Sequence, residues 1–334
     1  MCYITLEGSF LADLRKIQKT PTGTFFVCLP RDWAKKKGLN KGDLVCIDIT
    51  SDGKVVVDAE YNAEPPTRTT SLTVGPYLGR EIVGRYLLGY DTIDIEAKDR
   101  IDSAARSTVK STASSLSGLE IFEETSSKIS LHSLMQQQPS TSPEKILQRN
   151  YAIVAGMIRD ATNSFVYGDV ELAKNVIARD DESNRLYFLL VRILRTIIQN
   201  PRLNEKLGIT PIECLDYRLA ASLIEGIGDA CVQVAGKAIA LNGFKFSGEL
   251  QKLLVELQTI CCQAHEQALK SFVTKDIALA ASVRSMREEV DTTASGIEKV
   301  AKGASVDLMP QILAVTSFLR QIYERSVDIA DLVA

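Results

Sequence analysis

Apolar residues recur every three to four positions in residues 217–241, YRLAASLIEGIGDACVQVAGKAIAL. This spacing is typical of one face of an amphipathic helix and includes Leu219, Leu223, Ile227, Ala230, Val234 and Ala238. Similar spacing continues from residue 144 onward, interrupted by proline and glycine residues that end helices. The pattern predicts helices near residues 144–167, 170–200, 211–241, 247–272, 275–302 and 307–333.

An acidic pair occurs twice in these helices at a fixed offset. Glu225 and Asp229 are four residues apart, and Glu324 and Asp328 repeat that spacing 99 residues later. Residues four apart share one face of a helix, so the two carboxylates of each pair repel each other. An internal repeat of this length indicates two copies of one supersecondary unit. We therefore predict two three-helix repeats that form one elongated bundle of six helices.

Each acidic pair has a partner motif on the preceding predicted helix. In the first repeat, Asp180 and Asp229 are equally far along the chain from position 204.5, as are Asn184 and Glu225, and this point lies inside the proline-bounded segment 200–211. Antiparallel helices joined by a turn bring equidistant residues together. The sequence therefore predicts Asp180 opposite Asp229 and Asn184 opposite Glu225.

The second repeat has the corresponding motif at Arg287 and Asp291. The same symmetry about its turn predicts Asp291 opposite Glu324 and Arg287 opposite Asp328. Because Arg287 stands where an acid is expected, we expect weaker metal binding in this repeat. The arginine can pair with Asp328 and so partly replace a metal ion.

Oxygen ligands that converge from neighbouring helices suit a hard or borderline cation, which removes their mutual repulsion. The expected cofactor is a divalent or trivalent ion of iron, zinc, manganese or magnesium. The alternative is two solvated acidic faces whose spacing arose by chance. The candidate metal ligands are Asp180, Asp181, Asn184, Glu225, Asp229, Glu288, Asp291, Glu324 and Asp328.

Two glycines, Gly226 and Gly228, lie between the carboxylates of the first pair. Inside a helix each costs roughly 1 kcal/mol, so we expect them to permit close approach of a neighbouring helix. Arg325 and Val327 hold these places in the second repeat, where the approach should be looser.

These motifs, with the phrases RDDESNRLYFLLVR and IEGIGDA, resemble the PhoU family of phosphate-uptake regulators over about residues 144–334. The resemblance implies a metal-binding helical bundle that senses or relays phosphate status. It also implies a phosphate ABC transporter or a signalling protein as partner. Asn184 and Arg287 depart from the acidic pattern of that family.

Residues 14–60 follow a different, mostly β pattern. Strand-like segments at 14–19, 24–29, 44–50 and 54–59 surround a short predicted helix at 31–37 that ends at Gly38. Residues 14–41 hold eight lysines and arginines against Asp32 alone. Such a basic surface is the footprint of a protein that binds phosphate backbones, although a solvated lysine-rich helix face gives the same pattern. The candidate DNA contacts are Arg15, Lys16, Lys19, Arg31, Lys35 and Lys36.

This segment resembles the AbrB/SpoVT swapped-hairpin DNA-binding domain. The resemblance rests on Gly23, Leu29-Pro30, Trp33, Gly38-Leu39 and Lys41-Gly-Asp43. It implies a homodimer of interlocked hairpins that contacts DNA through arginines and lysines. Thr24 stands where many members carry a basic residue, and some relatives use the fold only to dimerise. A head of this kind before a PhoU-like bundle is an archaeal-type arrangement.

Residues 65–135 alternate between strand and helix patterns and predict a small α/β module. Its serine- and threonine-rich segment 107–117 could equally form a loose surface helix. The polar, proline-bounded segment 136–143 is expected to be a linker. The predicted domains are therefore the head at 1–64, the module at 65–135, and the two bundle repeats at 144–243 and 244–334. The predicted elements of the module are strands at 71–74, 92–96, 119–124 and 128–134 and helices at 78–88 and 102–115.

Composition adds few constraints. A length of 334 residues suggests two or three domains, and a net charge of −3 gives no general attraction to nucleic acid or anionic lipid. Seven cysteines without a CxxC pair indicate reduced thiols, and with no visible signal peptide we expect a cytoplasmic protein. No apolar run is expected to span a membrane, since Arg192 and Arg195 interrupt residues 186–198.

Enzymatic motifs are missing from the sequence. It has no GxSxG, P-loop or HExxH motif, and neither His132 nor His265 belongs to the Glu-x-x-His pattern of di-iron bundles. Cys261 and Cys262 with His265 have zinc-like spacing, but buried cysteines more often belong to a core.

The expected protein is a multidomain, mainly α, phosphate-responsive regulator of uptake and transcription and not an enzyme. The competing hypotheses are a carboxylate-cluster, metal-dependent hydrolase and a PhoU-like adaptor whose head only dimerises.

Overall fold

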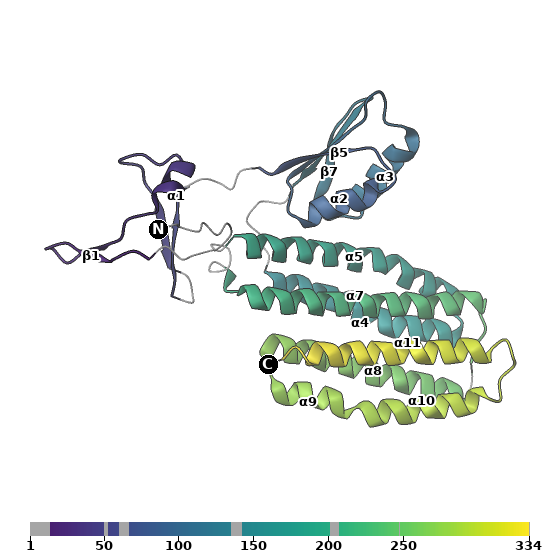
Figure 1. The fold of residues 1–334 in the computed structure, drawn as a ribbon. Helices are drawn as coiled ribbons and strands as arrows, with labels where there is room; N and C mark the ends of the chain where they lie inside the picture. Colours follow the sequence, from purple (N-terminus) through teal and green to yellow (C-terminus); the bar gives the residue numbers. More distant parts are fainter. Residues whose placement is uncertain are drawn as a thin grey trace, which may run out of the picture. The chain divides into compact units, whose positions relative to one another are not determined.

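The computed structural model describes residues 14–49, 53–59, 67–134, 142–200, 207–246 and 248–333. The chain divides into two compact units, Met1–Pro66 and Thr67–Ala334 (Figure 1). This division falls two residues after the predicted end of the head. Most of the predicted linker at 136–143 lies outside the described residues, but Ser142 caps the next helix and Pro143 begins it.

The described part of the first unit consists of two separate antiparallel hairpins and one helix. Strands β1 (Gln18–Lys19) and β2 (Phe25–Phe26) pair before helix α1 (Arg31–Lys36), and β3 (Cys46–Ile49) pairs with β4 (Val55–Asp58) after it. All five elements occur where the sequence predicts them, although the strands are shorter. Gly38 follows α1 with φ 69°, a backbone conformation that suits glycine, and so ends the helix as predicted.

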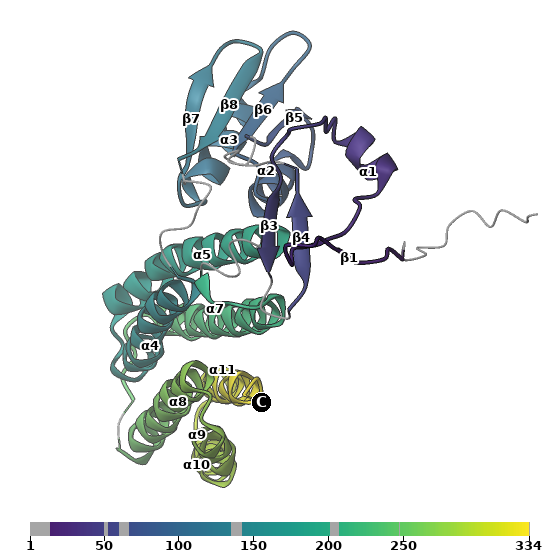
Figure 2. The ribbon, with the colours of Figure 1, turned by 90° about the vertical axis from the view of Figure 1, so that its left-hand side faces the viewer.

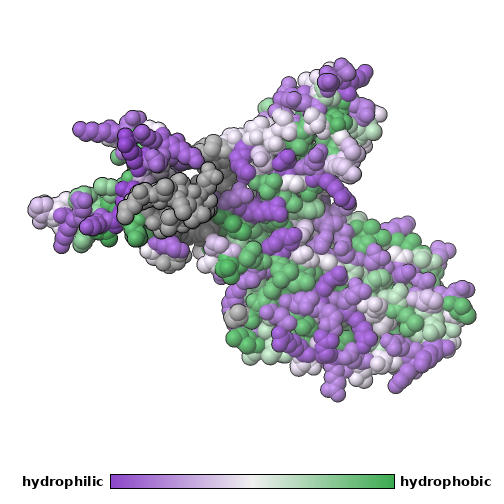
Figure 3. All heavy atoms as spheres, in the orientation of Figure 1, coloured by the Kyte–Doolittle hydropathy of each residue, from purple (hydrophilic) through white to green (hydrophobic). Residues whose placement is uncertain are grey.

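No described residue of this first unit is buried. Leu14, Ile49 and Leu44 are exposed by 92%, 70% and 69%, and Figure 3 shows hydrophobic residues at its surface beside hydrophilic ones. Burial of apolar surface is the main favourable term in folding. The hairpins by themselves therefore lack a core.

The second unit begins with the predicted α/β module. Its sheet has the order β5-β6-β8-β7, with β5 parallel to β6 and the other neighbours antiparallel, and helices α2 and α3 cover one face (Figure 2). Asp102 caps α3, while Val109 and Ala113 are buried in the module's core, so the alternative of a loose surface helix is wrong. The elements are β5 (Thr69–Thr73), α2 (Leu78–Leu87), β6 (Thr92–Glu96), α3 (Ser103–Ser114), β7 (Leu119–Glu124) and β8 (Lys128–Ser133).

Arg192 anchors the module to the helical bundle. Its side chain is 6% exposed, and its guanidinium donates to the main-chain oxygens of Tyr86 at 2.6 Å and Tyr90 at 2.9 Å. The same group lies 3.3 Å from the Ser133 hydroxyl, 3.5 Å from the Asp91 carboxylate and over the Tyr86 ring. The charge that interrupts an apolar run in the sequence is therefore the polar centre of an internal interface.

The helices of the bundle share one continuous core, which takes residues from both predicted repeats. Its helices start at local caps, such as Ser142 before α4, Asp169 before α5 and the Thr210–Glu213 capping box before α7. In Figure 1 the helices of the first repeat lie together beside those of the second. The helices are α4 (Pro143–Tyr167), α5 (Val170–Gln199) and α7 (Pro211–Ala240), followed by α8 (Gly248–Thr274), α9 (Ile277–Ser285), α10 (Arg287–Ala301) and α11 (Met309–Ala330).

The helix predicted at 275–302 is divided at Met286 into α9 and α10. The hydroxyl of buried Tyr323 lies 3.0 Å from the Val283 oxygen and 3.2 Å from the Arg284 oxygen, where it donates to carbonyls at the end of α9. The corresponding residue of the first repeat, 99 positions earlier, is Ile224, and there α5 runs without a break. The break between α9 and α10 is therefore accompanied by the Tyr323 hydroxyl on α11, for which the first repeat has no counterpart.

We expect Tyr323→Phe to lower the free energy of unfolding by about 1–3 kcal/mol, because buried carbonyls lose their donor. Urea unfolding followed by circular dichroism measures the change. The matched control is Tyr167→Phe, at a 47% exposed position of α4, which should change stability by less than about 0.5 kcal/mol. Equal effects of the two substitutions would contradict this role of the hydroxyl.

Among the described residues, one helix is long and apolar enough to cross a membrane by length and composition, namely α7 (Pro211–Ala240). By this test of length and composition alone, α7 departs from the prediction that no apolar run is long enough to span a membrane. Within its apolar window, 56% is buried inside the protein. Its apolar composition fits its place in the bundle, where it packs against α4, α5 and α11.

Candidate functional site

Facing carboxylates from α5 and α7 form the acidic cluster of the first repeat, defined here as Asp180, Glu225 and Asp229. Burial raises the pKa of Asp180, and the nearby Asp229 carboxylate raises it further. Asn184 donates to Asp180 Oδ2 at 2.9 Å, but Asp180 Oδ1 is buried without a hydrogen-bond partner. A buried carboxylate oxygen without a donor is costly, and a bound cation would remove that cost.

Glu225 belongs to the same electrostatic group. Burial raises its pKa, Asp229 and Asp180 raise it further, and Arg325 and Arg218 oppose the rise. Asp180 on α5 therefore lies within electrostatic reach of Asp229 and Glu225 on α7. Both carboxyl groups have a higher pKa in the folded protein than in the unfolded chain. The stability that they contribute when protonated is therefore present at low pH and is lost as the pH rises through the two raised pKa values.

The glycines between the carboxylates have separate roles. A Cβ at Gly228 would lie 3.4 Å from Asp180 Oδ1, so this glycine lets α7 approach Asp180 closely. A Cβ at Gly226 would instead lie 2.9 Å from Arg325 Nε on α11. The predicted close approach beside the carboxylates is confirmed, and at Gly226 it involves the other repeat.

The remaining candidates of the first repeat lie at the edge of the cluster. Asp181 and Asp229 are exposed, and Asn184 turns toward Asp180 on its own helix instead of toward Glu225. Within the part of the chain that the structure describes, no three His, Cys, Asp or Glu side chains are already arranged to hold a metal ion. The oxygen donors fit a hard cation in chemistry, and binding would require Glu225 and Asp229 to move toward Asp180.

In the second repeat, arginines neutralise the acidic residues. Arg287 forms a two-point ion pair with Glu324, with both N–O distances 2.7 Å, and Arg320 pairs with Asp291. The predicted pairs, Asp291 with Glu324 and Arg287 with Asp328, are wrong by one helical turn of α11. The predicted register would place two carboxylates opposite each other, whereas the observed one forms two ion pairs.

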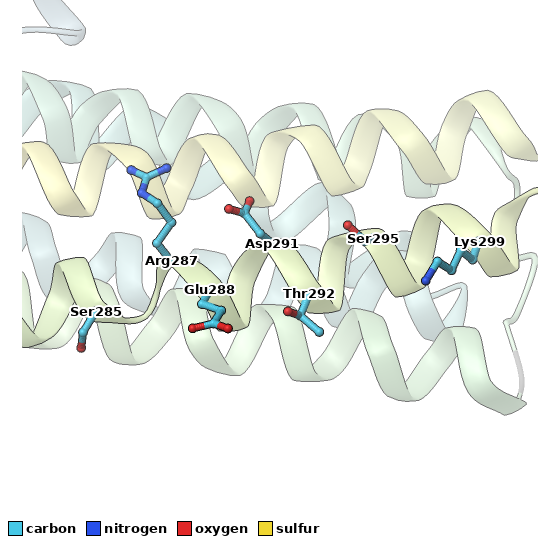
Figure 4. A pocket seen from close by; sticks show the side chains of 7 residues that line it. All are labelled: Ser285, Arg287, Glu288, Asp291, Thr292, Ser295 and Lys299. Atoms are coloured by element: carbon cyan, nitrogen blue, oxygen red, sulfur yellow. The ribbon is translucent and has the colours of Figure 1, made fainter.

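Glu288 takes no part in these pairs, although it lines an open groove of about 720 Å³ along α10 together with Arg287 and Asp291. Figure 4 shows Arg287 and Asp291 directed toward α11, while Glu288 points to the opposite side of α10. Asp328 is exposed on α11, and burial together with Asp331 and Glu324 raises its pKa. The four candidates of the second repeat therefore do not meet as one donor set, and this repeat does not fit a metal ion.

The zinc-like group on α8 belongs to the core. His265 is fully buried, and burial lowers its pKa to about 3, so the imidazole is neutral at physiological pH. Cys261 donates to the Leu319 oxygen at 3.2 Å, and Gln258 donates to Cys262 Sγ at 3.3 Å. Cys261 and Cys262 therefore hydrogen-bond to different groups, which favours the interpretation that both belong to the core and do not bind zinc.

All six candidate DNA contacts in the first unit are exposed. Arg31, Lys35 and Lys36 lie on α1, and Lys19 lies over the Phe25 ring of the neighbouring strand at 5.2 Å. Arg15 and Lys16 precede β1. The side chains are therefore accessible to a ligand.

Two arginines, Arg320 and Arg325, have roles that the sequence patterns did not predict. Both lie on α11, where Arg320 pairs with Asp291 and Arg325 Nη1 donates to the main-chain oxygen of Gly226. The 99-residue repeat makes Arg325 the counterpart of Gly226. The arginine that the second repeat carries where the first repeat has a glycine was the sequence signal that could have indicated the role of Arg325.

A helical bundle with acidic residues on the facing helices α5 and α7 defines the class of fold. Residues 147–238, which cover most of the first repeat, match the PhoU domain family. No curated protein matches the chain.

Solved PhoU proteins have a similar bundle. The chain is similar to the crystal structure of PhoU from Pseudomonas aeruginosa, with 21% identity and a TM-score of 0.51, covering 57% of this chain and 93% of that one. It also matches the phosphate transport system regulatory protein PhoU from Streptococcus pneumoniae, with 16% identity and a TM-score of 0.49, covering 57% and 91%. The first likeness shows the fold of the bundle.

Proposed function

We propose that the chain is a cytoplasmic, phosphate-responsive regulator whose first repeat binds a metal ion. The match of residues 147–238 to the PhoU domain family, and the fold shared with PhoU from Pseudomonas aeruginosa, support the regulatory role. The unpartnered, buried Asp180 Oδ1 beside Glu225 and Asp229 carries the metal-binding part. The partner is a phosphate ABC transporter or a signalling protein attached to it.

Within the cluster, Asp180 supplies the most constrained ligand, because Asn184 holds one of its oxygens and the other faces inward. Glu225 and Asp229 supply further oxygens from α7. A bound divalent or trivalent ion would neutralise carboxylates that repel one another. In the second repeat, Arg287 and Arg320 already supply that positive charge.

The first unit is proposed to dimerise and to bind DNA. Its described hairpins expose large apolar side chains and bury none, so a second copy would provide the missing core. The exposed cations around α1 would then contact backbone phosphates. This arrangement would connect phosphate status to transcription, and a head that only dimerises is the alternative.

We expect Glu225→Gln together with Asp229→Asn to lower the metal content of the purified protein, because two anionic ligands become neutral without a change of shape. The protein is purified without chelator and analysed for iron, zinc, manganese and magnesium. The same variant should bind less Mn²⁺ in a calorimetric titration.

The matched control is Glu324→Gln together with Asp328→Asn in the second repeat, which should leave the metal content unchanged. Unchanged metal in the first-repeat variant would refute the assigned site. Hydrolysis of phosphomonoesters by the metal-loaded protein, lost in Glu225→Gln, would instead favour the hydrolase.

A further inference from the structure

The sheet of the α/β module exposes polar side chains on the face opposite to α2 and α3. The two helices pack on the face that carries Ile93, Leu119 and Leu131, all of them buried (Figure 2). Successive residues of a strand point to opposite faces, and residues paired across antiparallel strands point to the same face. The register therefore defines an open sheet face, which carries Thr92, Asp94, Glu96, Glu120, Glu123, Lys128, Ser130 and His132.

A β-bulge adds an aromatic ring to the open sheet face. The pairing of β7 with β8 shifts between Ile121 and Glu123, so Phe122 is the extra residue of β7. A bulge of this kind redirects a side chain. The Phe122 ring stacks on the His132 imidazole, with centroids 4.2 Å apart and an interplanar angle of 4°. Phe122 is nevertheless 73% exposed, so the other side of its ring is accessible.

The open sheet face is negatively charged. Its lysine, Lys128, lies 3.0 Å from the Asp94 carboxylate, and this hydrogen bond raises the pKa of the lysine. The Glu123 and Glu96 carboxylates raise that pKa further, so they lie near the same ammonium group. Glu96, Glu120 and Glu123 are exposed. One lysine therefore stands against four carboxylates on this face, those of Asp94, Glu96, Glu120 and Glu123.

This combination of charge and ring fits a guanidinium group. A guanidinium is planar and positively charged, so it stacks on an aromatic ring and also donates paired hydrogen bonds to a carboxylate. An aromatic ring on a four-stranded sheet can also stack on a nucleic-acid base, but the carboxylates here would repel the phosphates. Small-molecule sites are concave, whereas this surface is an open sheet, which suits a segment of a protein.

We propose that the open sheet face docks an arginine-containing segment of a partner protein. One arginine stacks on the exposed side of Phe122 and pairs with Glu120 or Glu123, which flank the ring on the same face. Exposed aromatic residues that become covered are common centres of binding energy at protein interfaces. The proposal depends neither on the metal ion proposed for the first repeat nor on DNA binding by the first unit.

The test is fluorescence anisotropy of the full-length protein with a labelled, end-capped peptide of sequence RGRGR at low salt, where screening is weak. The peptide KGKGK carries the same charge, but its ammonium groups are not planar and do not stack. RGRGR should bind about two- to fivefold more tightly than KGKGK, the range that one exposed cation–π contact gives. Equal affinity for the two peptides, or no binding of RGRGR, would contradict the proposal.

Replacement of the ring tests the stacking directly. Phe122→Ser should remove the preference for RGRGR over KGKGK, whereas Phe122→Tyr keeps a ring and should retain the preference. Because Phe122 is 73% exposed, neither substitution should unfold the protein, which circular dichroism checks. A preference that survives in Phe122→Ser would refute the role of the ring.

Removal of the flanking charges is an independent test. Glu120→Gln together with Glu123→Gln should weaken RGRGR binding about three- to tenfold, because two surface ion pairs are lost. The matched control is Glu249→Gln together with Glu256→Gln, at exposed positions of α8, which should leave the affinity unchanged. Equal losses in both variants would show attraction to the overall charge of the protein and would overturn the proposal. Binding of single-stranded oligouridylate that is lost in Phe122→Ser would do the same, since the face would then bind nucleic acid.

Discussion

Replacement of Arg192 by methionine should lower the free energy of unfolding by about 3–5 kcal/mol, the usual effect of removing one partner from a buried, hydrogen-bonded charge. Methionine fills much of the same volume but donates no hydrogen bond. The main-chain oxygens of Tyr86 and Tyr90 would lose their donor, and Asp91 would lose a cation within 3.5 Å. The module should therefore detach from α5 before the bundle unfolds.

Urea unfolding followed by circular dichroism, together with limited proteolysis, measures both effects. The unchanged second unit should unfold as one unit, whereas Arg192→Met should show a separate early transition and faster cleavage within residues 67–134. Arg195→Met is the matched control, because Arg195 is an exposed arginine three positions further along α5. A single transition with unchanged midpoint in Arg192→Met would mean that other contacts, such as Arg68 with Gln199, hold the module.

Full-length protein should bind duplex DNA with an affinity that decreases steeply with salt. Each neutralised phosphate contributes a slope of about −0.9 to the plot of log affinity against log salt concentration. Changing Arg31 and Lys35 to glutamine should make the slope less steep by about one for each phosphate that is no longer neutralised, and binding should weaken by orders of magnitude at low salt. Fluorescence anisotropy at several salt concentrations measures both quantities.

The control for this experiment removes equal charge elsewhere. Lys252 and Lys270 are exposed on α8, and their replacement by glutamine should leave the slope unchanged. Analytical ultracentrifugation in parallel determines whether the chain is dimeric. A dimer without salt-dependent DNA binding would identify the head as a dimerisation device only.

The sequence predicts most of the fold because the helices are amphipathic and are separated by proline and glycine. It does not predict the break at Met286, since neither of those residues stands there. The donor that accompanies the break, Tyr323, is 37 positions further along the chain. Such compensation depends on tertiary contacts, which local periodicity cannot indicate.

The candidate site was predictable only where symmetry about the turn agreed with the electrostatics. In the first repeat the facing residues are mainly acidic and Gly228 permits close approach, so Asp180 lies within electrostatic reach of Asp229. In the second repeat Arg287 and Arg320 form ion pairs with acids one turn away from the predicted partners. Helix register in this repeat follows side-chain pairing between helices, which spacing along one chain does not determine.

The division of the second-repeat helix at Met286 also affects how amide protons exchange with solvent. Helix α5 has one continuous ladder of main-chain hydrogen bonds from Val170 to Gln199, so opening starts from its two ends. The corresponding part of the second repeat consists of α9, with 9 residues, and α10, with 15 residues, and so has two additional ends in its middle. Local opening costs less where fewer hydrogen bonds must break together. Amides beside Met286 should therefore exchange faster than those in the middle of α5, giving two otherwise similar repeats unequal local lifetimes.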